Sequence, residues 1–459
     1  MTDLPFVTDA DAPATPIYAI RSADWGGWIE SRPEALKRLC AAHDFKAQNG
    51  RILLAPATDG SIERVLFGVG DQANAMAMGA LSQNLPAGRY AIAAAPREFP
   101  AGLVATAWGL GAYAFDRYKP RKRPAPLLEP PGGADMAEVT RLVTAAWLAR
   151  DLVNTPTNDM GPDALQRAAE ALAHEHGASF GAIVGDELLA QNYPLIHAVG
   201  RAAAQAPRLL HLRWGDQGKP RVAIVGKGVT FDTGGLDIKP SAGMRIMKKD
   251  MGGAAHALAL AQIIMSAKLP IALDVFIPVA ENSISSDAFR PGDVIPSRKG
   301  LTVEIDNTDA EGRLILADAL TRACEDRPEL VIDFATLTGA ARTALGPDLP
   351  PFFTEDETLA ADLAKASAET CDPIWRLPLW NAYDGDMDSP IADLKNGGDG
   401  AFAGAIYGGL FLRRFVTAPA WVHFDIYAWS PKDRPARPQG GDAQSLRAVW
   451  RVLKARYGV

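Results

Sequence analysis

The stretch RVAIVGKGVTFDTGGLDIKPSAGMRIMKKDMGGAAH, residues 221–256, decides the fold of the larger part of this chain. It begins with a short apolar run, 222–225, which is typical of a strand buried on both faces of a parallel sheet. Lysines and aspartates follow among glycines, and a helix is expected from about Gly252. Because open α/β sheets bind ligands at the carboxyl ends of their strands, this stretch predicts a functional site directly after the strand.

A second stretch, IDNTDAEGRLILADAL at residues 305–320, also concentrates charge. Asp309 and Glu311 lie in a polar turn after a strand-like run at 301–305. Arg313 follows where apolar residues begin to recur at helical spacing. The three charged residues are therefore expected at the entrance of a helix.

The two stretches together supply four carboxylates and one lysine: Asp232, Asp250, Asp309, Glu311 and Lys227. Crowded carboxylates raise one another's pKa, and divalent cations reverse that effect. Oxygen ligands suit zinc, manganese or magnesium, and a lysine amine can bind a metal once it loses its proton. These residues therefore predict a site for two metal ions. The alternative, a surface cluster of salt bridges, fits poorly with a position directly after a buried strand.

At these residues the sequence resembles the leucine aminopeptidases, a family of cytosolic two-metal exopeptidases. NTDAEGRL at 307–314 matches the family signature, and GKGVTFDTGG (226–235), IKPSAGM (238–244) and DMGGAA (250–255) match its metal-binding segment. The resemblance implies a metal-dependent aminopeptidase that hydrolyses N-terminal amino acids, leucine-like and broad in range, from short peptides. The reaction would use a water molecule activated by two metal ions.

The resemblance also implies a role for each matching residue. The tighter of the two zinc or manganese ions would bind four side chains: Lys227, Asp232, Asp250 and Glu311. The more exchangeable ion would bind three: Asp232, Asp309 and Glu311. Lys239 would lie beside the scissile carbonyl, and Arg313 would hold a bicarbonate ion that transfers the proton. Five further positions would contact the substrate: Met247, Asn307, Thr336, Leu337 and Gly339.

The resemblance further implies a homohexamer of two trimers, with active sites that face an interior cavity and admit only short peptides. Two other functional classes stay open: another two-metal hydrolase, such as a phosphatase or deacylase, and an inactive scaffold oligomer. The first is less favoured because the two stretches contain a single histidine, His256, and the second because every candidate ligand is present. Neither GxGxxG nor GxxxxGK[ST] occurs, which disfavours nucleotide binding.

The length of 459 residues and a hydrophobic content of 48% predict at least two domains. We expect an N-terminal α/β domain with a Pro/Gly-rich linker at 1–132, and a catalytic domain at 133–459. In the larger domain, strand-like runs at 222–225, 271–279, 330–334 and 422–427 alternate with helical patterns such as 254–265. This alternation predicts a mainly parallel central sheet covered by helices on both faces.

The smaller domain is expected to contain strands at 51–56, 64–69 and 90–95 and a helix at 73–85. A helix is also expected at 136–152, leading into the larger domain.

The composition of the chain indicates the cellular compartment and the kinds of binding partner to expect. A net charge of −7 disfavours nucleic acid as the main partner, and three widely spaced cysteines fit a reducing compartment. The N-terminal residues contain neither a basic nor an apolar run, and no segment is long enough to span a membrane, so we expect a cytoplasmic protein without a signal peptide.

Five residues outside the predicted site have simpler interpretations. His256 lies one turn into an apolar helical pattern, where a packed core histidine is favoured over a metal ligand. Trp375 and Trp380 are expected in the core, and Lys248 and Lys249 are expected to be solvated.

Overall fold

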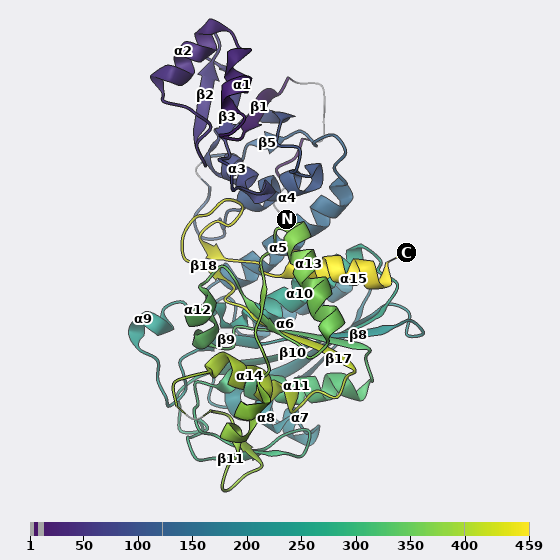
Figure 1. Ribbon diagram of the computed structural model, residues 1–459. Helices are drawn as coiled ribbons and strands as arrows, with labels where there is room; N and C mark the ends of the chain where they lie inside the picture. Colours follow the sequence, from purple (N-terminus) through teal and green to yellow (C-terminus); the bar gives the residue numbers. More distant parts are fainter. Residues whose placement is uncertain (1–3, 8–12, 122, 399, 459) are drawn as a thin grey trace. The chain divides into compact units, whose positions relative to one another are not determined.

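The computed structural model describes residues 4–7, 13–121, 123–398 and 400–458 (Figure 1). The N-terminal segment in which we expect no signal peptide therefore lies partly outside the described residues. The chain forms two compact units, one of residues 1–147 and 432–439 and the other of residues 148–431 and 440–459.

The smaller unit is a five-stranded sheet with helices. Its elements are β1 (Thr15–Ile20), α1 (Trp25–Glu30), α2 (Glu34–Ala42), β2 (Ile52–Pro56), β3 (Ile62–Gly68), a 3-10 helix (Ala75–Met78), α3 (Gly79–Asn84), β4 (Arg89–Ala94), α4 (Ala101–Gly111) and β5 (Leu127–Leu128). The strand order is β2-β3-β1-β4-β5, and all pairs are parallel except β2 with β3. The three predicted strands are confirmed as β2, β3 and β4, while the central strand β1 was not predicted.

The larger unit is built on a nine-stranded sheet. Its strands are β6 (Ser179–Val184), β7 (Arg208–Trp214), β8 (Arg221–Gly226), β9 (Gly228–Asp232), β10 (Ala272–Asn282), β13 (Leu330–Ala335), β14 (Pro351–Phe353), β15 (Trp375–Arg376) and β17 (Ala420–Asp425). Shorter strands lie outside this sheet: β11 (Val294–Pro296), β12 (Thr302–Glu304), β16 (Leu394–Lys395), β18 (Trp429–Ser430) and β19 (Gly440–Gly441).

Helices connect these strands (Figure 1). They are α5 (Met136–Asn154), α6 (Pro162–Glu175), α7 (Glu187–Ala190), α8 (Pro194–Gly200), α9 (Ser241–Met244), α10 (Gly252–Ser266), α11 (Glu311–Glu325), α12 (Gly339–Leu345), α13 (Glu357–Thr370), α14 (Gly404–Arg413) and α15 (Leu446–Tyr457), with 3-10 helices η2 (Met247–Met251) and η3 (Asn381–Met387). The predicted helix at 136–152 is confirmed as α5, and that at 254–265 as α10.

The centre of the large sheet is parallel, as predicted. Strands β10, β8, β13 and β17 pair in parallel, while β7 and β14 join this block in antiparallel fashion on its two sides. Strand β8 lies between β10 and β13. The chain runs from β8 through α10 to β10 on one side, and then from β10 through α11 to β13 on the other side. Crossovers in opposite directions place a ligand crevice at the carboxyl end of the central strand.

The two crossover helices cover opposite faces of the sheet. Ala223 and Val225 of β8 pack in a core with residues of α8, α11 and α14. Gly226, on the alternate face, lies against Ala254 and Ala257 of α10. Because both faces are covered, the central strands are buried along their whole length, which explains their continuous apolar runs.

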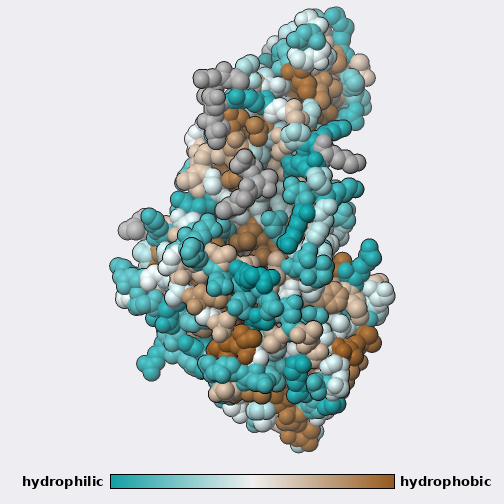
Figure 2. All heavy atoms as spheres, turned by 180° about the vertical axis from the view of Figure 1, so that it is seen from behind, coloured by the Kyte–Doolittle hydropathy of each residue, from teal (hydrophilic) through white to brown (hydrophobic). Residues whose placement is uncertain are grey.

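Some large hydrophobic residues remain exposed. The view from behind (Figure 2) shows hydrophobic residues gathered in several places among hydrophilic ones. Trp375 and Trp380, expected in the core, are 59% and 57% exposed, so that prediction was wrong. They belong to a segment, 375–402, that also exposes Tyr383, Ile391 and Phe402. Among the described residues, no helix has both the length and the apolar character needed to cross a bilayer.

One buried carboxylate joins α11 to the segments beside it. Asp318 is fully buried and accepts hydrogen bonds from the backbone N–H groups of Leu195 and Ile196 at the start of α8, and from that of Arg298. Burial raises the pKa of Asp318 from 3.8 to about 7, although these hydrogen bonds act in the opposite direction.

We expect Asp318 to make stability depend on pH. Because its pKa is raised on folding, its contribution is complete below 3.8 and is lost as pH rises through about 7. In urea unfolding, the free energy of the wild type relative to Asp318→Asn should therefore be higher at about pH 5 than at about pH 7.5. Asp362→Asn, at an exposed position of α13, is the control and should give equal differences at both pH values. Equal differences for Asp318→Asn would contradict this assignment.

Candidate active site

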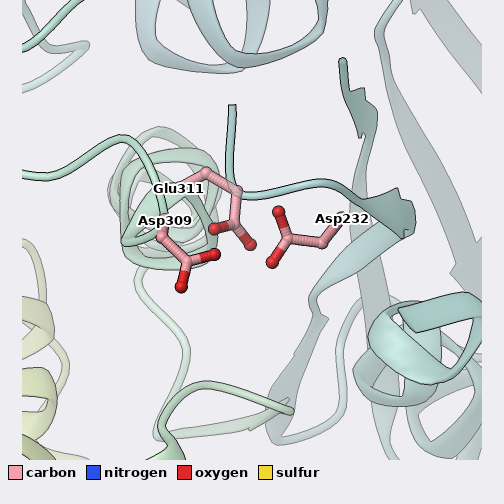
Figure 3. Close-up of side chains that lie close together, drawn as sticks. All are labelled: Asp232, Asp309 and Glu311. Carbon is pink, nitrogen blue, oxygen red and sulfur yellow. The ribbon is translucent and has the colours of Figure 1, made fainter. Parts of the chain in front are cut away.

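Three carboxylates from different parts of the chain converge at the carboxyl edge of the large sheet (Figure 3). Asp232 ends β9, Glu311 is the first residue of α11, and Asp309 lies in the turn before it. One oxygen of each lies within 4.8 Å of the others. Asp232 and Glu311 are buried, whereas the Asp309 side chain is 34% exposed. The arrangement has the spacing and oxygen donors of a metal site.

Lys227, the residue directly after β8, brings in the fourth carboxylate. Its Nζ lies 2.7 Å from Oδ2 of Asp250 and 2.8 Å from Oε1 of Glu311, and donates to the carbonyl oxygen of Thr336 at 3.1 Å. Thr336 in turn donates its hydroxyl to Oδ1 of Asp250 at 2.8 Å. The structure thus brings together all five residues that the sequence predicted as metal ligands.

Glycines permit the close approach of the elements that carry these side chains. A Cβ at Gly312 would lie 2.6 Å from Cε and 2.7 Å from Nζ of Lys227, so any larger residue would push α11 away from the lysine. Gly234 and Gly235 have φ values of +88° and +64°, which let the chain turn back directly after Asp232.

Burial and mutual repulsion disfavour the charged forms of two carboxylates. Burial, followed by repulsion from Asp232, raises the pKa of Glu311 to about 8 and that of Asp309 to about 6. Burial also acts to raise the pKa of Asp250, but attraction to Lys227 and Lys249 outweighs it and lowers that pKa. Without metal ions, the cluster is therefore held together by its lysines.

Both lysines of the cluster are held in the charged form. Burial acts against the charge of Lys227, but attraction to Asp250 and Glu311 outweighs it and raises the pKa of the amine. The pKa of Lys239 is raised in the same way, against burial, by Asp232 and Glu311. The Nζ of Lys239 lies 2.7 Å from Oδ2 of Asp232 and also pairs with Asp309.

Two buried oxygens of the cluster lie close to Lys227. Oδ2 of Asp250 and Oε1 of Glu311 are 2.7 and 2.8 Å from its Nζ, and no other donor to them is found among the described residues. Such oxygens are well suited to bind a cation. A divalent ion would also remove the repulsion between the carboxylates, so the residues present fit a metal site.

A cavity opens beside the cluster. Lys227, Asp232, Lys239 and Asp309 line it together with four of the five predicted substrate-contacting residues: Met247, Thr336, Leu337 and Gly339. Asn307 is not among the lining residues, and its side chain instead accepts a hydrogen bond from the backbone N–H of Asp309 at 2.7 Å. Asn307 thus shapes the turn that carries this carboxylate.

Arg313 is buried behind the cluster and does not line the cavity. Its Nη1 donates to the carbonyl oxygen of Asn396 at 2.6 Å, and its guanidinium lies 5.9 Å from the ring centroid of Phe411. Burial lowers the pKa of Arg313 to about 10, and its Nε has no hydrogen-bond partner among the described residues. A buried cationic donor without a partner fits an anion.

Asn282 and Thr308 connect the two stretches that carry the candidate metal ligands, a role that the sequence analysis did not predict. The side-chain amide of Asn282 donates to Oδ1 of Asp232 at 2.9 Å and to the carbonyl oxygen of Thr308 at 3.1 Å. The hydroxyl of Thr308 donates to the carbonyl oxygen of Gly234 at 2.7 Å, and its N–H donates to Asp237 at 2.8 Å. The position of Asn282 at the end of β10 is the one available signal, because β10 reaches the same edge of the sheet.

Asp425, the last residue of β17, also lines the cavity. It accepts hydrogen bonds from the N–H groups of Leu337 and Thr338 at 2.9 and 3.1 Å and from the Thr338 hydroxyl at 2.6 Å. The carboxylate of Asp425 therefore holds in place the loop of Leu337 and Thr338, two residues that line the cavity.

The lysine pair next to Asp250 is not freely solvated, so that prediction was wrong. Lys249 is 5% exposed, and burial lowers the pKa of its amine to about 8. Lys248 is half-buried and donates to the carbonyl oxygen of Asn154 at 2.5 Å. His256, by contrast, is a packed core residue as predicted, and its ring forms a hydrogen bond with the carbonyl oxygen of Gly252.

Two family profiles match the chain. That of the cytosol aminopeptidase family, catalytic domain, matches residues 147–450, and that of the M17 aminopeptidase N-terminal domain matches residues 15–130. The chain belongs to the cytosol aminopeptidase family. It is accordingly a peptide hydrolase of a metal-dependent family.

Relatives of this family agree in sequence and in structure. A probable cytosol aminopeptidase of Geobacter sp. (strain M21) is 40% identical over 366 residues, which are 76% of this chain and 74% of the relative. The crystal structure of a cytosol aminopeptidase from Coxiella burnetii is 43% identical, with a TM-score of 0.93 over 98% of this chain and 99% of that one. The bottromycin maturation enzyme BotP in complex with Mn is 32% identical, with a TM-score of 0.86 over 97% of this chain and 100% of that one.

We expect Asn282→Leu to weaken Mn²⁺ binding by about 10–100-fold, because a neighbour that orients a ligand affects metal affinity to this extent. Leucine has a similar volume but cannot hold Asp232 or Thr308. Titration calorimetry measures the affinity, and circular dichroism shows whether the fold is retained. Asn84→Leu, which removes an amide contact to a helix carbonyl in the smaller unit, is the control. Unchanged Mn²⁺ affinity in folded Asn282→Leu would show that Asp232 does not need this contact.

Proposed function

We propose that the protein is a two-metal aminopeptidase that removes N-terminal amino acids from short peptides. The observation that carries this proposal is the convergence of four carboxylates and Lys227 beside a cavity at the carboxyl edge of the sheet. Four residues of the cluster also line the cavity, so metal ions held by the cluster would face a molecule in the cavity; they are Lys227, Asp232, Asp250 and Asp309.

Five residues would hold the metals. One ion would bind Lys227, Asp232, Asp250 and Glu311, and the other would bind Asp232, Asp309 and Glu311. When bound, two zinc or manganese ions lower the pKa of a water molecule and supply Lewis acidity for the peptide carbonyl. Lys227 is protonated in the metal-free protein and would release its proton as it becomes a ligand.

Lys239 would stabilise the negative charge that develops on the carbonyl oxygen. It lines the cavity, and its neighbours keep it protonated, so its ammonium is a ready hydrogen-bond donor. Its present partners, Asp232 and Asp309, are themselves proposed metal ligands. Metal binding would therefore free the ammonium to donate toward the substrate.

Arg313 would hold a small anion, which we propose to be bicarbonate. Its buried Nε, which has no hydrogen-bond partner among the described residues, and its position two residues after Glu311 support this role. Bicarbonate at this position could accept and return a proton during hydrolysis, a task for which the described cluster contains no histidine.

The proposal includes the homohexamer and the short-peptide substrates that the family resemblance implies. The exposed apolar residues of segment 375–402 offer surface for such an assembly. A closed assembly would exclude folded proteins from the cavity.

A direct assay tests the proposed reaction. Protein loaded with Mn²⁺ or Zn²⁺ should cleave leucine p-nitroanilide, should fail on its N-acetyl derivative because a free amine is required, and should lose activity with a chelator. Release of p-nitroaniline is measured by absorbance. Cleavage of a phosphate ester instead would favour the phosphatase alternative, and no turnover of any of these substrates would favour an inactive scaffold.

Asp309→Asn and Glu311→Gln should each abolish turnover of leucine p-nitroanilide. Each change replaces a charged metal ligand by a neutral amide of the same size, so the fold should be retained and metal affinity lost. Steady-state rates and metal content are the measurements. Asp306→Asn, at an exposed position of the same loop, is the control and should keep its turnover. Normal rates in either ligand variant would exclude these carboxylates from the reaction.

A further inference from the structure

Two basic side chains line the wall of the cavity next to the metal cluster. Lys249 of η2 and Arg342 of α12 both line it, as does Tyr427 between them. The Nζ of Lys249 lies 5.3 Å from the ring centroid of Tyr427, and the guanidinium carbon of Arg342 lies 4.8 Å from the same centroid. One aromatic ring thus holds two cations at the edge of one cavity.

Fewer carboxylates lie close to these two side chains than to the lysines of the metal cluster. Lys227 and Lys239 each approach two carboxylates, whereas the nearest carboxylate oxygen to Lys249 is Oδ1 of Asp250 at 3.8 Å. That oxygen already accepts the hydroxyl of Thr336 at 2.8 Å. Arg342 forms no ion pair within the part of the chain that the structure describes. The cavity wall therefore carries positive charge that the described carboxylates balance only in part.

Lys249 carries an amine that a molecule in the cavity could contact. The residue is 5% exposed and lines the cavity, and no hydrogen bond from its Nζ to a protein acceptor is found among the described residues. Burial and the positive charge of Arg342 disfavour the charged form of the amine, whereas attraction to Asp250 favours it. A hydrogen-bond acceptor on a molecule in the cavity would therefore give this amine a partner that the described residues do not supply.

The position of Lys249 relates it to the substrate. It is two residues from Met247 and shares the cavity with Thr336 and Gly339, and the family resemblance implies that these three residues contact the substrate. It is also adjacent to the proposed metal ligand Asp250. A peptide whose free amine is held at the metals would therefore extend its first side chain toward Lys249. This step rests on the proposed function.

We propose that the cavity selects peptides whose first residue is acidic, glutamate or aspartate, with Lys249 as the main determinant of specificity and Arg342 as a second. The side-chain carboxylate would accept a hydrogen bond from the Lys249 amine and lie in the field of Arg342. An ammonium and a neutral amine both donate hydrogen bonds, so the preference for an acceptor does not depend on the charge of Lys249. A leucine side chain would leave the amine without a partner, and sites of this kind discriminate strongly against such substrates.

The experiment compares kcat/KM of the manganese-loaded protein for the p-nitroanilides of L-glutamate, L-glutamine and L-leucine. The wild type should prefer glutamate to leucine. Lys249→Met keeps the length of the side chain and its apolar stem but removes the donor, and should lower the glutamate-to-leucine ratio by at least about tenfold. Lys249→Arg should restore part of the ratio, and Arg342→Met, at an exposed position, should lower it by a smaller factor.

Lys248→Met is the matched control, because Lys248 is the neighbouring lysine, does not line the cavity and donates to a backbone carbonyl instead. It should leave the ratio within about twofold of the wild type. Inhibition constants of free L-glutamate and L-leucine give a second readout, of binding alone, that should change in parallel. Circular dichroism confirms folding, and the exposed Arg342 variant keeps the test valid where a Lys249 variant does not fold.

The outcomes separate this inference from the function on which it rests. Cleavage of the leucine substrate, with a glutamate-to-leucine ratio that neither Lys249→Met nor Arg342→Met changes, would overturn the acidic preference and leave the aminopeptidase proposal standing. Failure to cleave any of the three anilides would overturn the aminopeptidase proposal, and the acidic preference with it.

Discussion

The ion pairs of Lys227 with Asp250 and Glu311 are the interaction on which the site depends. Four carboxylates gathered at a buried sheet edge repel one another, and burial adds to the cost of their charge. The ammonium of Lys227 reduces that cost from inside the cluster, at 2.7 and 2.8 Å from two of them. It can stand there because Gly312 leaves room for it at the start of α11. A lysine in this position compensates charge in the folded protein, and in the proposed function it would become a ligand when a metal ion binds.

Geometry at the carboxyl ends of the strands supports this arrangement. Asp232, Asn282 and Asp425 end β9, β10 and β17, and Lys227 directly follows β8. Rigid strands deliver these side chains to one edge, and hydrogen bonds between loops hold them there. Because such contacts are made between backbone groups and buried polar side chains, the cluster is preorganised before any ligand binds.

Charge is distributed unevenly around the cavity. Carboxylates dominate where the metals are proposed. Lys249 and Arg342 line the same cavity, and of the two only Lys249 forms an ion pair among the described residues, with Asp250 at 3.8 Å. The carboxylates would attract cations to their part of the cavity, and Lys249 and Arg342 would attract a carboxylate to theirs. Catalysis and selection of the first residue would thus share one cavity and rely on opposite charges.

The amino-acid sequence by itself determined the family, the class of fold and the five candidate metal ligands, because these depend on local features: buried apolar runs, glycine turns and two long motifs. Only the tertiary structure decided which other residues serve the site. Asn282 and Asp425 lie far from the motifs in the chain, and their partners are known only once β10 and β17 take their places in the sheet. Burial is likewise a property of the whole fold, which is why Lys249 was predicted to be solvated and lies inside, and Trp375 was predicted to be buried and lies outside. The sequence motifs identify the candidate ligands, whereas the packing of the fold determines which residues surround those ligands.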